Sequence, residues 1–156
     1  MPNLYPASHD AAILTAEEVD SGSPVGYRNG IAFDDELGDF KRDGKYKILD
    51  NDGIESWKSW CVNCLSTERY AHLAYSSDFG IDTTSAFMAT SRKEAESILS
   101  REITEALLAD PYGRTAYVEE ISFDWEAPDS VAVSLTVQGI DTVTIDLTAY
   151  INKRGT

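Results

Sequence analysis

The sequence has few of the residues that build disulfide frameworks and metal sites. Its 156 residues include only two cysteines and two histidines. Cys61 and Cys64 lie three residues apart on one predicted helix, which is not the pattern of a disulfide-stabilised secreted domain. His9 and His72 stand at spacings unrelated to the cysteines, so the four residues do not form a zinc ligand set. The sequence therefore predicts no metal site and no cofactor.

Long hydrophobic runs are also missing. No apolar stretch approaches the ~20 residues that a transmembrane helix needs. The first residues, Met1 to Asn3, lack the basic start and the long apolar stretch of a signal peptide. We therefore expect a protein that is made and kept in a cytoplasm and has no membrane partner.

Basic residues are scarce. Thirteen lysines and arginines stand against 27 aspartates and glutamates, which gives a formal charge of −14. Phosphate backbones and anionic membranes would be repelled over most of such a surface. The composition therefore argues against a nucleic-acid partner. The length fits one domain of common size.

Residues 52–80 form the stretch around which the chain is organised. Asp52 followed by Glu55 is a capping pattern, so a helix is expected to begin here. Its polar end is expected at residues 67–70. The apolar residues recur at three- and four-residue steps and predict one buried helix face, which consists of Ile54, Trp57, Cys61, Cys64 and Leu65.

The segments on either side have weaker signals. Residues 1–30 are expected to form an extended arm, followed by a short β-meander of strands at 31–34, 39–43 and 46–49 with a tight turn at Asp43-Gly44. After an irregular segment with Phe87 and Met88 in the core, Ser91 and Glu94 repeat the capping pattern. The apolar face of this second helix comprises Ala95, Ile98, Leu99, Glu102, Ile103, Ala106 and Leu107.

The last third of the chain changes its hydrophobic period from 3.6 to 2, which predicts three antiparallel strands. One face of this sheet is expected to be wet and the other covered by the two helices. The predicted fold class is α+β: a two-layer domain with a short N-terminal β-meander and two helices packed on an antiparallel C-terminal sheet. We expect an arm at 1–30, the domain at 31–151 and a tail at 152–156.

Three patterns resemble catalytic or metal motifs, and none is complete. The segment from Trp60 to Cys64 resembles a thioredoxin site, but Cys61 lies two turns inside the predicted helix, where the helix dipole lowers a thiol pKa little. The segment 50–53 resembles a calcium loop that lacks its first and last ligands. Carboxylates such as Glu68 and Asp78 are surface charges in an acidic chain. The sequence therefore predicts no catalytic residues.

Several motifs together resemble a known family, the small baseplate wedge proteins of contractile phage tails, in the branch found in defective prophages and phages of Gram-positive bacteria. The resemblance covers residues 31–151. It includes the segments 31–34, 38–40, 52–55 and 65–70, together with Tyr75 and the pair Phe79-Gly80. The sequence differs from the most studied branch at 66–69, where Ser-Thr-Glu-Arg replaces a Pro-Gly-Glu-Arg type of turn.

The resemblance implies a compact α+β domain, which also occurs in type VI secretion baseplates, with a structural role in the virion. Such a protein sits in several copies in the inner baseplate, binds larger wedge proteins and presents strands to which the first sheath ring can add. Its implied partners are the other wedge proteins and the tail sheath or tube proteins. It implies a partner-binding site at Thr67, Glu68, Arg69, Tyr70, Phe79 and Gly80. Two interpretations of Arg69 remain open: it docks the wedge proteins while Glu68 orients it, or it pairs with a nearby acid at the helix end.

The sheath is expected to add to an exposed sheet edge. Either residues 131–138 or residues 143–147 should form that edge, unless the N-terminal meander covers both. The candidate edge strand consists of Val143, Thr144, Ile145, Asp146 and Leu147. Two other functions stay open. One is a peptidoglycan-cleaving glycosidase, since some members of the family were called lysozymes, and the other is a free-standing protein-binding adaptor.

Overall fold

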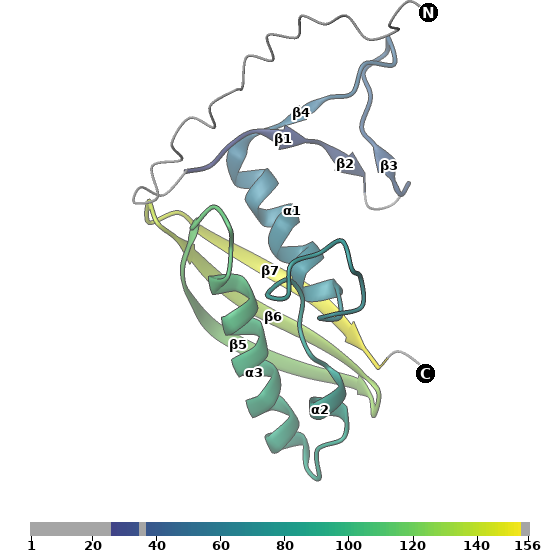
Figure 1. Ribbon diagram of the computed structural model, residues 1–156, viewed down its shortest axis with the longest axis vertical. Helices are drawn as coiled ribbons and strands as arrows, with labels where there is room; N and C mark the ends of the chain where they lie inside the picture. Colours follow the sequence, from purple (N-terminus) through teal and green to yellow (C-terminus); the bar gives the residue numbers. More distant parts are fainter. Residues whose placement is uncertain (1–25, 35–36, 154–156) are drawn as a thin grey trace, which may run out of the picture.

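The computed structural model describes residues 26–34 and 37–153, and it has two layers (Figure 1). One layer is an antiparallel sheet in the order β5-β6-β7, formed by Thr115–Ala127, Ser130–Gly139 and Thr144–Asn152. The other layer consists of helices: α1 (Gly53–Ser66) packs over β7 and α3 (Arg92–Leu108) packs over β5. The predicted α+β class, with two helices on a C-terminal sheet, is confirmed.

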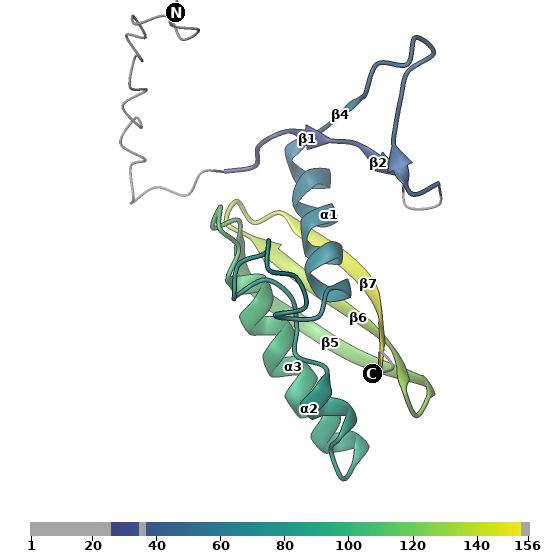
Figure 2. The ribbon, with the colours of Figure 1, turned by 45° about the vertical axis from the view of Figure 1, so that its right-hand side comes forward.

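The N-terminal strands are shorter than predicted. β1 (Gly30–Ile31) pairs with β4 (Asp50–Asn51), and β2 (Phe33–Asp34) pairs with β3 (Asp39–Phe40). The predicted strand at 46–49 is wrong. Ile48 forms only an isolated bridge with Arg42, and the ladder continues at β4 instead. The β-meander formed by β1 to β4 lies beyond the N-terminal end of α1, away from α3 (Figure 2). Most of the predicted extended arm, residues 1–25, falls outside the described part of the chain.

The Asp43-Gly44 turn is present. Its main-chain bond runs from the Tyr46 N–H to the Asp43 carbonyl at 3.0 Å. The Asp43 carboxylate adds two bonds by accepting the N–H groups of Lys45 and Lys47 at 2.7 and 2.9 Å. Tyr46 adopts a left-handed φ of 64°, a conformation that usually favours glycine or asparagine. An aspartate that caps its own turn therefore closes this hairpin.

Helix α1 begins where its cap predicts. Asp52 is the N-cap, and its carboxylate accepts the Glu55 N–H at 2.8 Å. Trp57, Cys61, Cys64 and Leu65 are buried as expected. The prediction for Ile54 is wrong, since its side chain is 38% exposed. Ile54 lies at the flank of the buried face, where the described residues provide no further layer to cover it.

Helix α3 also begins at its predicted cap. Ser91 Oγ accepts the Glu94 N–H at 3.2 Å, and the Glu94 carboxylate accepts the Thr90 N–H at 3.1 Å. Its buried face matches the prediction, including the charged residue Glu102, except that Ile98 is only half-buried. Before α3, the short helix α2 (Thr84–Phe87) occupies part of the segment expected to be irregular. Met88 was expected in the core but is 75% exposed, because it lies just past the end of α2.

The sheet has one dry and one wet face, as alternation predicts. Along β6 and β7 the residues facing the helices are buried, and those between them are exposed or half-buried. The core joins the dry face to α1 and α3 around Trp57, whose indole N–H donates to Thr115 Oγ1 at 3.1 Å. Tyr27, which lies within the expected N-terminal arm, packs against Trp57 with ring centroids 5.3 Å apart.

Within the described ranges, no helix has the length and hydrophobicity needed to cross a membrane.

Candidate functional site

The candidate partner-binding residues belong to the loop that follows α1. Thr67 is the C-cap of the helix, and its hydroxyl donates to the Asn63 carbonyl at 2.7 Å. The chain then runs beside residue 81. The Ile81 N–H donates to the Thr67 carbonyl and the Arg69 N–H donates to the Ile81 carbonyl, each at 3.0 Å. These bonds close the loop at its base, so residues 67–69 and 79–81 lie side by side.

Gly80 permits this closure. Its backbone is left-handed, with φ of 94°, a region that side chains rarely adopt. A Cβ at this position would lie 2.7 Å from the Thr67 carbonyl oxygen and 3.0 Å from the Arg69 nitrogen. The Gly80 N–H also donates to the Cys64 sulfur at 3.4 Å. Gly80 therefore has a local structural role at the base of the loop.

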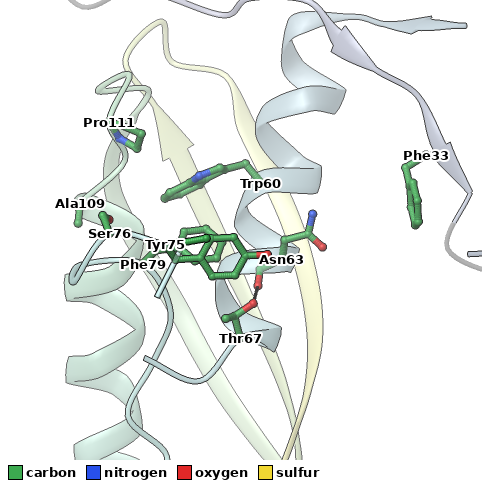
Figure 3. Close-up of a pocket in the computed structure, with 10 residues that line it drawn as sticks. Phe33, Trp60, Asn63, Thr67, Tyr75, Ser76, Phe79, Ala109 and Pro111 are labelled. Atoms are coloured by element: carbon green, nitrogen blue, oxygen red, sulfur yellow. Dashed lines mark hydrogen bonds between the residues drawn. The ribbon is translucent and has the colours of Figure 1, made fainter. Parts of the chain in front are cut away.

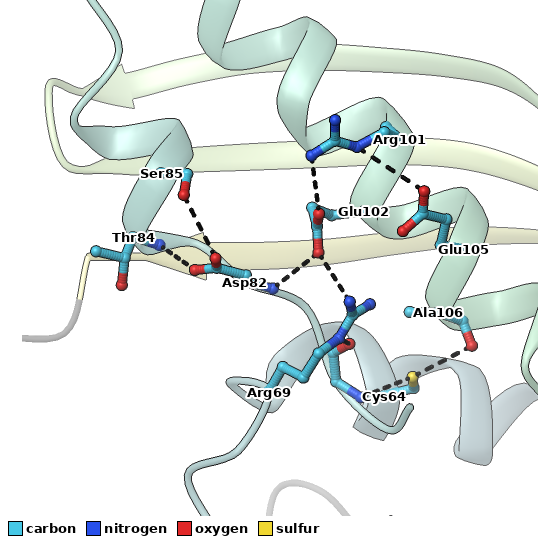
Figure 4. A network of polar contacts seen from close by, with 10 residues as sticks. Cys64, Arg69, Asp82, Thr84, Ser85, Arg101, Glu102, Glu105 and Ala106 are labelled. Atoms are coloured by element: carbon cyan, nitrogen blue, oxygen red, sulfur yellow. Dashed lines mark hydrogen bonds and ion pairs between the residues drawn. The ribbon is translucent and has the colours of Figure 1, made fainter. Parts of the chain in front are cut away.

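Arg69 ties the loop to α3 (Figure 4). Its Nε donates to the Gly80 carbonyl at 3.1 Å, and its Nη1 lies 3.3 Å from Glu102 Oε2. The Glu102 carboxylate also accepts the Asp82 N–H at 3.3 Å and contacts Arg101 at 3.2 Å. The side chains of Arg69 and Glu102 are only 15% and 8% exposed. The guanidinium therefore joins the loop, the segment before α2 and α3.

The hypothesis that Glu68 orients Arg69 is wrong, because the carboxylate that contacts Arg69 is that of Glu102 on α3. The backbone of Glu68 instead forms an isolated β-bridge with Ile81, and its carboxylate accepts a long hydrogen bond of 3.4 Å from the Thr84 hydroxyl. The partner of Arg69 lies 33 residues further along the chain. The sequence held one signal of this contact. Glu102 lies in the apolar face of the second predicted helix, and a buried carboxylate requires a cationic partner.

Changing Arg69 to lysine is expected to lower the free energy of unfolding by about 1–2 kcal/mol, because an ammonium cannot keep both contacts of the guanidinium fork. Urea denaturation followed by tryptophan fluorescence measures the change. Arg101→Lys is the matched control, since Arg101 contacts the same carboxylate but is 64% exposed. Unchanged stability together with lost binding to wedge proteins would instead assign Arg69 to the interface.

Beside this loop lies an aromatic groove of about 570 Å³ (Figure 3). The groove is lined by Trp60 and Asn63 of α1, by its C-cap Thr67, by Tyr75 and Phe79 of the loop, and by Phe33 of β2. The rings of Tyr75 and Phe79 lie 4.9 Å apart, and those of Trp60 and Phe79 lie 5.9 Å apart. Of the candidate residues, Thr67 and Phe79 line the groove. Tyr70 is 74% exposed and is not among the lining residues.

A buried ion pair supports the groove, and the sequence analysis missed it. Asp110 and Arg114 form a two-pronged pair, with Nε to Oδ2 at 2.8 Å and Nη2 to Oδ1 at 2.9 Å. The guanidinium lies 5.6 Å from the Trp60 ring centroid and 5.0 Å from that of Tyr112. The pair therefore fixes the turn between α3 and β5 against the tryptophan of the groove.

The two cysteines are buried in the core. Burial raises the pKa of the Cys61 thiol strongly and also raises the pKa of Cys64. Both thiols are therefore protonated at neutral pH, whereas a thioredoxin-type nucleophile needs a lowered pKa. Across residues 26–34 and 37–153, no three His, Cys, Asp or Glu side chains form a group that could hold a metal ion.

The candidate sheath-edge residues lie at an edge of the sheet. β6 is the central strand, so residues 131–138 are excluded as an edge, and β7 and β5 are the two outer strands. Val143 precedes β7, and Thr144, Ile145, Asp146 and Leu147 form its first half. β7 pairs with β6 over nine consecutive residue pairs without a shift in register.

The register identifies the groups that face the open edge. The Gly139 N–H bonds to the Val143 carbonyl and the Lys153 N–H bonds to the Asp129 carbonyl, so the odd-numbered residues of β7 form the hydrogen-bonded pairs with β6. In an antiparallel ladder these pairs alternate with pairs whose backbone groups point away. The N–H and C=O groups that point to the open edge, where no described residue forms a further strand, therefore belong to Thr144, Asp146, Thr148, Tyr150 and Asn152.

The opposite edge differs from β7. β5 pairs with β6 through three register shifts, and Glu120 adopts a left-handed φ of 50°. Its solvent-facing residues include Glu119, Asp124 and Glu126. Bulges and charged side chains are the devices by which edge strands avoid pairing with another chain. β7 has one charged residue, Asp146, and no bulge.

The sequence matches a known protein family. The family model described as the contractile injection system sheath initiator matches residues 29–142, well over half of the chain. Among curated proteins, none matches. The matched region begins just before β1 and ends between β6 and β7, so it includes β1 to β4, the three helices and the first two strands of the C-terminal sheet. The chain belongs to the family of contractile injection system sheath initiators, which are structural proteins of contractile tails.

Proposed function

We propose that this protein starts the sheath by offering β7 as an open sheet edge to a strand of the first sheath ring. The observation that carries the proposal is the difference between the two outer strands. Five residues of β7 direct backbone N–H and C=O groups outward along a regular strand, whereas β5 is bulged and acidic. Addition of a partner strand to such an edge uses main-chain hydrogen bonds for affinity.

Sheath assembly from purified components tests this proposal. Baseplates assembled with this chain should start sheaths in the presence of sheath protein, and baseplates assembled without it should not. Sheaths that start equally well without the chain would contradict it.

We also propose that the larger wedge proteins dock at the loop after α1, in the aromatic groove. Buried aromatic anchors near the centre of an interface carry much of the binding energy. Trp60, Tyr75 and Phe79 supply such rings, and the Arg69 contacts hold the loop that carries two of them. In this proposal Arg69 positions the loop, whereas the aromatic side chains make the contacts.

Changing Tyr75 to alanine is expected to weaken copurification with wedge proteins at least about fivefold, which corresponds to the loss of one interface anchor. Tyr75 is half exposed, so the free protein should keep its stability. Tyr46→Ala is the matched control, since Tyr46 is an exposed tyrosine at the Asp43-Gly44 turn and is not among the lining residues of the groove. Equal binding of both variants would remove the groove from the interface.

We propose that the protein has no enzymatic activity. A glycosidase needs two carboxyl groups at a fixed separation across a sugar-binding cleft. The largest of the described pockets, the aromatic groove, has no carboxylate among those of its lining residues that the structure describes. The purified protein should therefore leave the turbidity of cell-wall suspensions unchanged at any pH. Clearing that disappears in Glu68→Gln or Asp78→Asn would support the glycosidase function instead.

The remaining properties follow from this role. We propose that the protein is assembled in the host cytoplasm, enters the virion in several copies per tail baseplate, and contacts wedge, sheath or tube proteins. The formal charge of −14 supports the absence of a nucleic-acid partner. A free-standing adaptor would be favoured only if the protein bound none of these components.

A further inference from the structure

The outer face of the sheet has charge of one sign only. From Thr115 to Asn152 the sequence contains no lysine or arginine, and it has seven acidic residues: Glu119, Glu120, Asp124, Glu126, Asp129, Asp141 and Asp146. The outward side chains of β7 are those of Thr144, Asp146, Thr148, Tyr150 and Asn152, all exposed. Asp146 is the charged member, and one of its oxygens accepts the Thr136 hydroxyl at 2.8 Å.

The inner side of the same edge is apolar. β7 directs Ile145, Leu147, Ala149 and Ile151 toward the helices. Leu65 of α1 lines a small pocket with Ile151 and Asn152 at the end of β7. Trp57, one turn after the start of α1, lies against Gly139 near the beginning of β7. Helix α1 therefore runs along β7 in the direction of the strand, which agrees with Figure 1.

Ile54 lies on the same flank of α1 as Leu65. Residues 54, 58 and 65 are four and seven positions apart, so they form one row along a 3.6-residue helix. Leu65 in this row lies near the end of β7, and Trp57, three residues after Ile54, lies near its beginning, so Ile54 lies toward the beginning of β7. Its side chain is apolar and 38% exposed, so the described residues leave part of it uncovered. A fourth strand beside β7 would add inward side chains below this row.

We propose, on the basis of the proposed sheath-starting function, that the strand received by β7 has two different faces. Its inward side chains are apolar and cover Ile54, and its outward side chains are basic and lie across from Asp146 on the acidic face. Opposite charges on directly paired strands stabilise a sheet and like charges destabilise it. The structure thus assigns the incoming strand an alternating sequence of aliphatic and basic residues.

Three synthetic nine-residue peptides test the assignment with the full-length ¹⁵N-labelled protein. One alternates valine with lysine, the second alternates valine with glutamate, and the third is a scrambled form of the first with the same charge. NMR titration gives the dissociation constant from the amide shifts of β7. The lysine peptide should bind about threefold to tenfold more tightly than the glutamate peptide. The scrambled peptide should not shift β7.

Two variants separate the local contacts from the net charge of the protein. Asp146→Lys should reduce or reverse the preference between the two alternating peptides, while the total charge stays strongly negative. Ile54→Ser should weaken both alternating peptides about threefold without changing their ratio, because Ile54 covers apolar side chains. Since both residues are exposed, both variants should remain folded.

The outcomes distinguish this inference from the proposed function. Equal binding of the lysine and glutamate peptides to β7, or no effect of Asp146→Lys, would overturn the assignment of a basic outward face. No effect of Ile54→Ser would overturn the assignment of the inward face. Shifts at β5 instead of β7, or no shift with any peptide, would overturn the proposed role of β7 itself.

Discussion

Replacing Arg114 with methionine is expected to lower the free energy of unfolding by about 3 kcal/mol. The side chains of Arg114 and Asp110 are only 5% and 0% exposed, and removal of one partner leaves a buried charge without its counterion. The Asp110 carboxylate would keep the N–H bonds from Tyr112 and Arg114, at 3.2 and 2.9 Å. These bonds keep the expected loss at the lower end of the range for broken buried pairs, about 3–5 kcal/mol.

Arg42→Met is the matched control for this change. Arg42 forms a surface pair with Asp39 at 3.7 Å, and both side chains are largely exposed. Such pairs contribute about 0–1 kcal/mol. Urea denaturation of both variants measures the two losses. A loss for Arg114→Met as small as that for Arg42→Met would show that the Asp110–Arg114 pair does not stabilise the turn between α3 and β5.

Replacing Thr148 with proline is expected to abolish sheath initiation while the protein stays folded. The Thr148 N–H points to the open edge and not to β6, so proline removes a group that only a partner strand would use. The expected loss of folding stability is about 1 kcal/mol, because the β6–β7 ladder keeps all of its bonds. The number of sheaths seen by electron microscopy, compared with the unfolding midpoint, measures the two effects.

Thr148→Ala is the matched control, because alanine removes the same side chain but keeps the N–H group. Thr136→Pro is a second comparison. Thr136 belongs to the central strand, and its N–H and C=O groups face β5, so proline there should disrupt the β5–β6 ladder and unfold the sheet. Equal losses of stability and initiation in Thr148→Pro would mean that residue 148 is internal to the folded sheet.

Local signals were sufficient to predict most elements of the fold. The side chains of Asp52 and Ser91 accept the N–H groups three residues on, so a pattern of four residues was enough to place each helix start. The change from period 3.6 to period 2 located the sheet. The two-residue strands of the arm were less predictable, since turn residues and isolated bridges hold them more than hydrophobic alternation does.

The site depends on contacts that the sequence pattern does not contain. Arg69 meets Glu102 across 33 residues, and periodicity indicated only that Glu102 lies in an apolar face. Ile54 and Met88 were assigned to the core because they are apolar, although the helix flank and the end of α2 leave them exposed. The choice between residues 131–138 and 143–147 as the edge required the strand order, which places β6 in the centre.

Amide hydrogen exchange on the full-length protein, with and without purified sheath protein, tests the central claim most directly. The amides of Thr144, Asp146, Thr148, Tyr150 and Asn152 point to the open edge of β7, so they should exchange more slowly when the sheath is added. The amides of β5 should not change. Protection of β5 with no change in β7 would contradict the proposal that β7 starts the sheath.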